Sequence, residues 1–198
     1  MEHSEQILLE KAKSGDVAAF EELIDSYQKK VFNLALRIIG NYDDAADLAQ
    51  ETFVRIYKAI SNFKEQSSFS TWVYRITTNV CLDELRRRKN KKVVSLDEDI
   101  HMNDGDMKRQ VMSEDPGPDE AAEREEVRRV VNDAINKLSE DLRVVITLRD
   151  LQGMSYEEIA KTLDLPGGTV KSRINRARLA LKKVLLSERE LLFEGYVK

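Results

Sequence analysis

The sequence has little of what disulfide frameworks and metal sites require. Its 198 residues include one cysteine, Cys81, and two histidines, His3 and His101. A single cysteine excludes an internal disulfide, and these three residues cannot supply the three or four ligands of a zinc site. We therefore expect no metal and no cofactor, and we interpret Cys81 as a small apolar residue on a helix face.

Long apolar runs and strand-like alternation are also lacking. No segment approaches the roughly 20 consecutive apolar residues that a membrane span needs, and residues 1–10 lack a basic segment leading into an apolar run. We expect a cytoplasmic protein that does not insert into membranes by itself. With 41% hydrophobic and 34% charged residues, the chain is predicted to be all-α, with two small helical domains.

The charge is strongly segregated along the chain. The formal net charge is -4, yet residues 93–126 hold twelve acidic and three basic residues, which leaves the remainder with +5. Because a polyanion is steered by local basic faces rather than by total charge, the acidic total does not exclude a nucleic-acid partner.

Apolar spacing of three and four predicts three helices in the first half of the chain. Asp16 is the expected N-cap of a helix that Gly40 ends. The second runs from Asp43 to about residue 60, and a loop follows over residues 61–69. The third runs from Trp72 to about residue 90, with Ser70 or Thr71 as its expected cap.

A break in periodicity over residues 93–118 predicts a flexible acidic linker, ending in Pro116-Gly117-Pro118. This places domains at residues 1–92 and 119–187, followed by a tail at 188–198. The second domain is expected to begin with a helix whose inward residues are Val127, Val130, Val131, Ala134, Ile135 and Leu138. Residues 139–141 should cap the next helix, which ends about Gly153.

The C-terminal pattern is typical of a helix-turn-helix. Ser155 and Glu158 form a capping box, and Leu163-Asp164-Leu165-Pro166 is a tight turn before a long helix. On a helical wheel, Val170, Ile174, Ala177 and Leu181 share one side, and Lys171, Ser172, Asn175 and Arg176 lie opposite. Residues 165–187 contain six cations and no carboxylate, which favours a helix seated in the DNA major groove. A merely solvated cationic face is the alternative.

A second candidate nucleic-acid surface lies about seventy residues upstream. Residues 86–92, which include Arg86, Arg87 and Arg88, predict phosphate affinity without sequence information. Aromatic and small polar residues precede them, a mixture suited to unstacked bases; they are Phe63, Ser67, Ser68, Phe69, Thr71, Trp72, Tyr74, Thr77 and Asn79. Trp72, Ile76 and Val80, spaced four apart, are also consistent with a simple core stripe, whereas Asn79 can bind a base edge bidentately or bond within the protein.

Four ordered motifs resemble those of bacterial RNA polymerase sigma factors of the extracytoplasmic function (ECF) class. They are residues 44–53 (DAADLAQETF), 69–79 (FSTWVYRITTN), 148–159 (LRDLQGMSYEEI) and 168–173 (GTVKSR). The resemblance covers nearly the whole chain except the linker and the tail. It implies a sigma-2 and a sigma-4 domain that direct core polymerase to promoters.

The resemblance also implies roles for individual residues. The acidic helix would bind the clamp helices of the largest catalytic subunit, through Asp47, Gln50, Glu51 and Phe53. The minus-ten element would be read and melted without nucleotide hydrolysis, a flipped base entering a pocket near Phe63, Ile76 and Asn79, with further contacts from Ser67, Ser68, Phe69, Trp72, Arg86, Arg87 and Arg88. The minus-thirty-five element would be read by Thr169, Lys171, Ser172, Arg173, Asn175, Arg176 and Arg178. The polymerase beta flap and an anti-sigma factor are the other partners that the resemblance implies.

Linker length predicts that the chain needs a larger assembly to read both elements. A flexible coil of 26 residues averages about 28 Å end to end, whereas major-groove sites two helical turns apart are roughly 70 Å apart. We therefore expect the protein alone to bind promoter DNA poorly. Asn175 and the loop at residues 64–68 fall where such proteins vary, so the promoter sequence is not predicted.

Two other function classes compete with this interpretation. A helix-turn-helix regulator that never joins polymerase would explain the last helix but not the aromatic and amide cluster. A nucleic-acid enzyme would need clustered carboxylates or a nucleophile with a base, and the acidic residues fall mainly in the linker and on an exposed helix face. We expect no catalytic residues.

Overall fold

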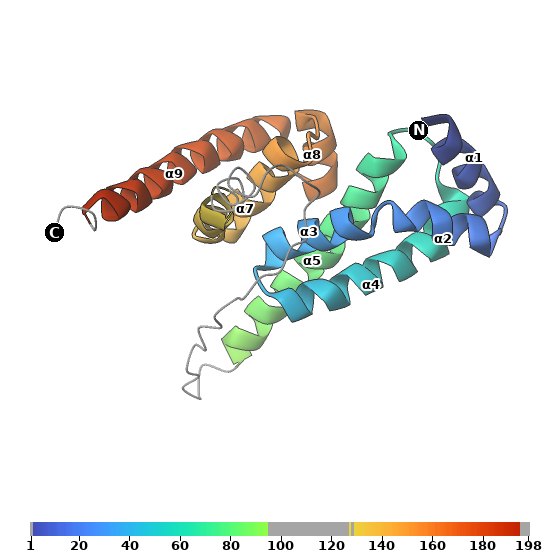
Figure 1. The fold of residues 1–198 in the computed structure, drawn as a ribbon, viewed down its shortest axis with the longest axis horizontal. Coiled ribbons are helices and arrows are strands. Elements are labelled where there is room, and N and C mark those ends of the chain that lie inside the picture. The colour runs from blue at the N-terminus through green and yellow to red at the C-terminus, as the bar shows by residue number, and fades with distance from the viewer. Residues whose placement is uncertain (1, 95–126, 128, 195–198) are drawn as a thin grey trace, which may run out of the picture.

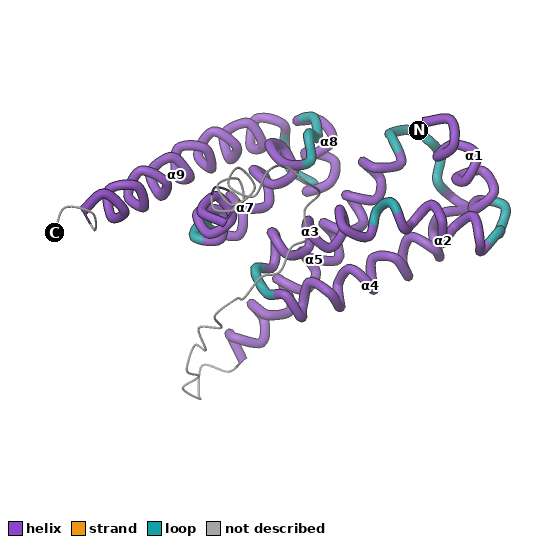
Figure 2. The backbone as a smooth tube through the Cα atoms, in the orientation of Figure 1, coloured by secondary structure: helices purple, strands orange, loops and turns teal. Residues whose placement is uncertain are grey.

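The computed structural model describes residues 2–94, 127 and 129–194, and in these ranges it contains helices and no strand. The N-terminal half holds α1 (Glu2–Lys13), α2 (Val17–Asp25), α3 (Gln28–Ile39), α4 (Tyr42–Ala59), a short 3-10 turn (Ile60–Asn62) and α5 (Phe69–Val94). The C-terminal half holds helical residues 129–136, α7 (Glu140–Ile146), a π-helical turn (Thr147–Leu151), α8 (Tyr156–Leu163) and α9 (Gly167–Glu194). Figures 1 and 2 show the two helical groups side by side, with α9 extending away from α5. The predicted all-α, two-domain class is confirmed; residues 95–126, where most of the predicted linker falls, lie outside the described ranges.

Capping groups set several helix boundaries where the sequence predicted them. Asp16 accepts a hydrogen bond from the Ala19 amide, and Gly40 ends α3 with a φ of 79°. The Ser155 and Glu158 capping box is present at the start of α8. Each cap satisfies backbone groups that lack a partner inside the helix.

Two boundary predictions were wrong, and one helix was not predicted. The helix expected from Asp16 to Gly40 is broken at Ser26 and Tyr27, because Tyr27 turns into the core, where its ring lies 5.3 Å from that of Phe69. Helix α5 begins at Phe69 rather than Trp72, since Ser68 is the residue whose hydroxyl accepts a bond from the Thr71 amide. The N-terminal helix α1 was not predicted, although Leu9 and Ala12 are buried at helical spacing.

The first helix of the C-terminal domain is also less regular than its apolar pattern predicted. Ala134, Ile135 and Leu138 are buried as expected, whereas Val127 is exposed and Val130 and Val131 are half-buried. The buried residues therefore lie only at the C-terminal end of this segment.

The buried side chains form two clusters, and one of them crosses between the domains. The first lies within α1 to α5 and includes Leu23, Val31, Ile56 and Val73. The second joins residues of α3, α4 and α5 to residues of α7, α8 and α9; it includes Leu34, Ile38, Val80, Cys81, Val145, Leu148, Ile159 and Ile174. The two domains therefore share an apolar core in this structure.

Two hydrogen bonds accompany this shared core. The Thr71 hydroxyl donates to the Glu158 carboxylate at 3.0 Å, and the Arg143 guanidinium donates to the Ile38 carbonyl at 3.5 Å. Cys81 is fully buried in the shared core, as its apolar interpretation predicted, and burial raises the pKa of its thiol to about 12.

Neither a membrane span nor a metal cluster is found in the part of the chain that the structure describes. None of its helices combines the length and apolar character needed to cross a bilayer. Within the same ranges, no group of three or more His, Cys, Asp or Glu side chains is placed to hold a metal ion.

Candidate functional surfaces

The outer side of α4 presents a group of polar side chains that we call the acidic surface: Asp47, Gln50 and Glu51. All three are exposed, and Phe53 is half-buried beside them. The opposite side of the helix is anchored by buried Leu48, Thr52 and Ile56, and the Thr52 hydroxyl donates to the Leu48 carbonyl at 2.7 Å. Helical spacing thus brings three of the four sequence-predicted residues to one solvent-facing side.

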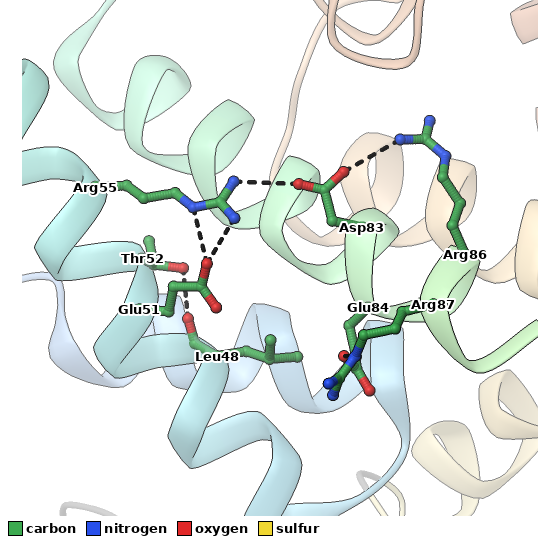
Figure 3. A network of polar contacts seen from close by, with 8 residues as sticks. All are labelled: Leu48, Glu51, Thr52, Arg55, Asp83, Glu84, Arg86 and Arg87. Carbon is green, nitrogen blue, oxygen red and sulfur yellow. Dashed lines mark hydrogen bonds and ion pairs between the residues drawn. The ribbon is translucent and has the colours of Figure 1, made fainter. Parts of the chain in front are cut away.

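Arg55 connects the acidic surface to α5 (Figure 3). Its Nη2 and Nε atoms lie 2.6 and 3.0 Å from Oε1 of Glu51, and its Nη1 lies 3.2 Å from Oδ2 of Asp83. The guanidinium therefore fixes the Glu51 carboxylate with two hydrogen bonds, which restricts its direction more than a single contact would. Asp47 enters no ion pair with a described residue, so its charge stays open to a partner.

The three arginines near the end of α5 are engaged in ion pairs within the domain. Arg86 lies 3.3 Å from Asp83, Arg87 lies 2.7 Å from Glu84, and Arg88 contacts both Glu84 at 2.8 Å and Asp44 at 2.7 Å. Hydrogen bonds from Arg87 and Arg88 lower the pKa of Glu84. The pair of Arg86 with Asp83 is exposed and contributes about 0–1 kcal/mol, so a phosphate could displace it at small cost. Glu84 has a side-chain exposure of only 12%, so its pairs with Arg87 and Arg88 are not exposed pairs of this kind.

Phe63, Phe69 and Trp72 form an aromatic cluster at the start of α5. Their ring centroids lie 5.0 to 5.7 Å apart. Phe63 and Phe69 are buried, and Trp72 is half-buried. The two phenylalanines are therefore core residues in this structure, and Trp72 is the member of the cluster that solvent reaches.

One side of α5 carries Trp72, Ile76 and Asn79, which follow each other at intervals of four and three residues. Trp72 and Ile76 are half-buried, and Asn79 is exposed. This arrangement places an amide next to apolar surface, as base capture requires. The prediction that Thr77 offers a hydroxyl to bases was wrong, because Thr77 is fully buried and donates to the Val73 carbonyl at 2.9 Å.

The serines before α5 contribute mainly to its first turn. Ser68 is exposed, and its hydroxyl bonds to the Thr71 amide and to the Thr71 hydroxyl at 2.9 Å. Ser67 is half-buried, and its hydroxyl reaches the Ser68 carbonyl at 3.4 Å. Both serines lie close to the aromatic cluster in the sequence, but their hydroxyls already form hydrogen bonds within the protein.

The helix-turn-helix forms as the capping pattern predicted. Asp164 ends α8 with a φ of 51°, and α9 begins at Gly167, one residue after Pro166. Val170, Ile174 and Ala177 are buried. We call the opposite side of α9 the reader face: Lys171, Ser172, Asn175 and Arg176, all of which are exposed.

Two other sequence-predicted cations of α9 are turned toward the domain. Arg173 is half-buried and lies 3.2 Å from Asp141 of α7. Arg178 lies 2.9 Å from Asp150, and this hydrogen bond raises the pKa of the guanidinium. Thr169 is half-buried at the start of the helix. These arginines therefore orient α9 on the helices before it.

Gly167 and Gly168 have no neighbouring atoms within 4 Å of where a Cβ would lie. Close packing against another described helix therefore does not account for these glycines. We predict instead that a phosphate approaches this helix start.

Sequence reasoning missed the groups that join the two domains. Glu158 was interpreted only within its own helix, and Arg143 was not singled out. Asp83, which pairs with Arg55 between α4 and α5, was not singled out either. The pairing of Glu51 with Arg55 carries a sequence signal, since their spacing of four is typical of helix ion pairs. The partners 28 and 87 positions away, Asp83 for Arg55 and Thr71 for Glu158, have no local signal.

Comparison with known proteins finds matches across both domains. The Sigma-70 region 2 family matches residues 23–91, and the Sigma-70, region 4 family matches residues 128–181. The RNA polymerase sigma-H factor of Pseudomonas aeruginosa is 38% identical over 188 residues, covering 93% of this chain and 95% of the relative. The ECF RNA polymerase sigma-E factor of Escherichia coli K12 is 40% identical over 182 residues, covering 90% of this chain and 92% of the relative.

Two solved structures are similar over most of their length. The sigma factor RpoE of Bartonella quintana, in complex with the anti-sigma factor NepR, has a TM-score of 0.65 and 26% identity, covering 84% of this chain and 96% of that chain. CnrH, in complex with the cytosolic domain of CnrY, has a TM-score of 0.62 and 28% identity, covering 93% of this chain and 98% of that chain.

Proposed function

The chain belongs to the ECF class of the sigma-70 family of RNA polymerase sigma factors, and we propose that three of its surfaces divide the work of promoter recognition. The observation that carries the proposal is that surfaces of three different chemistries are exposed on α4, α5 and α9. We assign the surfaces on α4 and α5 to a domain of residues 1–92. We assign the surface on α9 to a domain of residues 119–187. The residues between them are the linker, and residues 188–198 are a tail.

The acidic surface on α4 binds core polymerase, through the clamp helices of its largest catalytic subunit. Asp47 and Glu51 supply exposed negative charge, Gln50 supplies an amide, and half-buried Phe53 supplies apolar area at the margin. Charge complementarity of this kind sets the orientation and the rate of association. Arg55 prepares the surface by holding Glu51 in one direction before the partner arrives.

Helix α5 reads and opens the minus-ten element. Asn79 contacts the edge of a displaced base, while Trp72 and Ile76 supply the apolar surface that the base packs against. Phe63 and Phe69 support Trp72 from beneath, since both are buried against it. Capture of the base offsets the few kcal/mol needed to unstack it, so no nucleotide hydrolysis is required. Arg86, Arg87 and Arg88 exchange their ion pairs for phosphates, with Ser67 and Ser68 at the start of the helix.

The reader face of α9 recognises the minus-thirty-five element in the major groove. Asn175 and Ser172 reach base edges, and Lys171 and Arg176 bind phosphate or guanine. Thr169 lies at the helix start, where backbone amides attract phosphate. Arg173 and Arg178 keep the helix at its angle to α7.

Further partners follow from family membership. A groove of about 430 Å³ between the end of α7 and α9, lined by Ile146, Leu181, Leu185 and Leu186, suits an apolar segment of the polymerase beta flap. An anti-sigma factor is an expected regulator, as in the solved complex of the Bartonella relative. We place the protein in the cytoplasm, where it meets polymerase and DNA, and assign it no catalytic reaction.

Run-off transcription with purified core polymerase tests the proposal. A library of promoter sequences is transcribed by core enzyme with the wild-type chain and with the double variant Asp47→Lys, Glu51→Lys. We expect the wild type to select a promoter class and the variant to lose both transcription and co-elution with core. The matched control is Glu22→Lys with Asp25→Lys, two exposed carboxylates of α2.

The experiment also separates the sigma factor from a helix-turn-helix regulator that does not join polymerase. A regulator would bind duplex DNA through α9 and would be unaffected by charge reversal on α4. Core-dependent transcription that survives the double variant would therefore refute the assignment of the acidic surface.

A further inference from the structure

Helix α1 contacts the loop that leads into α5. The Lys13 ammonium donates to Oε1 of Glu65 at 2.7 Å, and the Gln6 amide donates to Oε2 of the same carboxylate at 3.4 Å. Glu65 lies 52 positions after Lys13 in the chain, so this contact exists only in the folded protein. We call these three residues the loop tether.

The backbone at Glu65 has a conformation that residues other than glycine seldom adopt. Its φ is 54°, and among the described non-glycine residues only Asp164, which ends α8, also has a positive φ. Glu65 ends no helix, because it lies between the turn at residues 60–62 and the start of α5. Strained conformations persist where the surrounding contacts determine them, and the loop tether supplies such contacts at this residue.

Lys13 can hold the loop because it is itself held on α1. Its Nζ lies 3.0 Å from Oε1 of Glu10, one turn earlier in the helix. The hydrogen bonds to Glu65 and Glu10 raise the pKa of Lys13, and the bond from Lys13 lowers the pKa of Glu65. Both members of the pair therefore stay charged at neutral pH.

Helix α1 is a fixed support, since it packs on the same core as the aromatic cluster. Leu9 and Ala12 of α1 belong to the buried cluster that contains Phe63 and Phe69. Helix α1 also contacts the turn at residues 60–62, from which the loop departs (Figure 1). The loop is thus tethered to an element that the core already holds in place.

A second contact from α1 supports the first residue of α5. Glu5 accepts a 2.9 Å hydrogen bond from the Tyr27 hydroxyl, and the Tyr27 ring lies edge-on to that of Phe69. Phe69 in turn lies 5.7 Å from Trp72. Helix α1 therefore stands behind both the loop and the start of the helix that carries the proposed minus-ten side chains.

We propose that Lys13, assisted by Gln6, is a positioning residue for recognition of the minus-ten element, because it fixes the loop at residues 64–68 through Glu65. This inference rests on the proposed assignment of α5 to that element. Lys13 acts through the loop and does not itself touch the base.

The position of the loop makes its fixation matter for base recognition. Glu65 is two residues from Phe63 and three from Ser68, so it lies within about 11 Å of both. Lys64 and Gln66 flank it and are exposed, and they are the side chains that the tethered loop presents to DNA. A loop that is already ordered loses less conformational entropy when it meets a base. The tether also neutralises the Glu65 carboxylate beside a polyanionic ligand.

Three substitutions on α1 test the role of Lys13. Lys13→Met removes the ammonium and keeps an apolar stem. Lys13→Arg keeps a charged donor and should behave as the wild type. Lys11→Met is the matched control, because it makes the same change of charge at an exposed position of the same helix.

The first measurement uses the full chain without polymerase. Trp72 is the one tryptophan of the sequence, and its ring centroid lies 5.0 Å from that of Phe63, where the loop begins. Its fluorescence therefore reports on the aromatic cluster. We expect acrylamide to quench Trp72 more strongly in Lys13→Met than in the wild type, Lys13→Arg or Lys11→Met.

The second measurement is run-off transcription by core polymerase on promoters whose minus-ten bases are varied. The readout is the ratio of transcript from the preferred base to transcript from the next base at each position. Lys13→Met should lower this ratio by up to about fivefold at minus-ten positions, without changing minus-thirty-five preference or co-elution with core. Glu65→Ala should cause the same loss, and the double variant no further loss, since both residues act through one contact.

The outcomes separate positioning from a merely structural role. If Lys13→Met lowers the melting temperature but leaves every minus-ten ratio unchanged, or if Lys11→Met alters the ratios equally, the positioning role is overturned while the proposed function stands. A wild-type chain that gives no core-dependent transcript overturns the proposed function, and with it the positioning role.

Discussion

The hydroxyl of Thr71 donates a 3.0 Å hydrogen bond to the carboxylate of Glu158, 87 positions further along the chain. The same carboxylate accepts a 2.7 Å bond from the Ser155 amide in the capping box of α8. One side chain therefore stabilises the start of the helix-turn-helix and joins it to the proposed minus-ten helix. Disturbing Glu158 should change both the stability of the domain and its position.

The free energy of unfolding should fall at acid pH because the Glu158 carboxylate becomes protonated. The Ser155 amide, the Ser155 hydroxyl, the Thr71 hydroxyl and nearby Lys161 hold the pKa of this carboxyl below its ordinary value of 4.5. A carboxyl with a lowered pKa contributes stability that is complete above pH 4.5 and is lost as the pH falls through the pKa of the folded state. Glu158→Gln keeps an amide able to cap the helix but does not titrate. In thermal melts from about pH 3 to about pH 7, the gap between wild type and variant should narrow below pH 4.5; a constant gap would contradict this role.

Arg55 should tune core binding without being required for it. Arg55→Lys keeps the charge but cannot hold Glu51 with two hydrogen bonds as the guanidinium does. Since exposed pairs contribute about 0.2–1 kcal/mol, we expect the Kd for core polymerase to rise about 1.4- to fivefold, less at high salt. Fluorescence anisotropy measures the Kd, and Lys58→Arg on the same helix is the control. An unchanged Kd at low salt would show that Glu51 needs no orientation by Arg55.

Alanine substitutions of two neighbouring arginines of α9 should affect DNA binding and stability differently. Arg176 belongs to the exposed reader face, whereas Arg178 is paired with Asp150. Arg176→Ala should weaken binding of the isolated promoter duplex and lower the salt slope by about one unit. Arg178→Ala should lower the melting temperature while changing the salt slope less. Titrations at several salt concentrations, with melts of both variants, test this; equal effects on the slope would place Arg178 on the DNA as well.

Gly40 should be more sensitive to alanine than Gly15. Both have positive φ, 79° and 98°, so a Cβ strains the backbone at either position by about 1 kcal/mol. At Gly40 the new atom would also lie 3.2 Å from the Arg143 guanidinium, whereas at Gly15 it meets nothing within 4 Å. Urea unfolding should show a larger loss for Gly40→Ala than for Gly15→Ala. In an Arg143→Met background this difference should shrink; if it persists, the crowding comes from elsewhere.

Local sequence signals predicted most helices correctly because their causes lie within a few residues. Asp16, Gly40 and the Ser155 and Glu158 pair act on backbone groups of their own turns. The sides of α9 were also predictable, because a period of 3.6 residues separates buried Val170 from exposed Lys171. Tyr27, which packs against Phe69, and Thr77, which is fully buried, are positions where tertiary packing overrides a local pattern. Val127 is exposed although its spacing predicted burial.

The candidate surfaces also contain some features that local sequence predicted and others that depend on tertiary packing. Asn79 and the reader face were singled out from residue type and spacing, whereas Asp47 was singled out only through the resemblance, which implies the roles of all of them. The pairing of Arg87 and Arg88 with Glu84 was within helical reach, whereas the contacts of Arg88 with Asp44 and of Arg55 with Asp83 depend on how α4 lies on α5. Burial of Phe69 likewise depends on Tyr27, which lies far away in the chain.

The amino-acid sequence by itself determined most of the helices, their caps, the segregation of charge and the family to which the chain belongs. Each of these depends on short-range periodicity or on motifs of consecutive residues. Only the tertiary structure decided that the domains share a core, that Thr71 meets Glu158 and that Arg143 is enclosed between them. Apolar side chains at helical spacing predict that one side of a helix will be buried. Because the hydrophobic effect is non-directional, they do not predict which other surface will cover it. Which surface covers which is settled by shape and by a few polar contacts, and those exist only once the chain is folded.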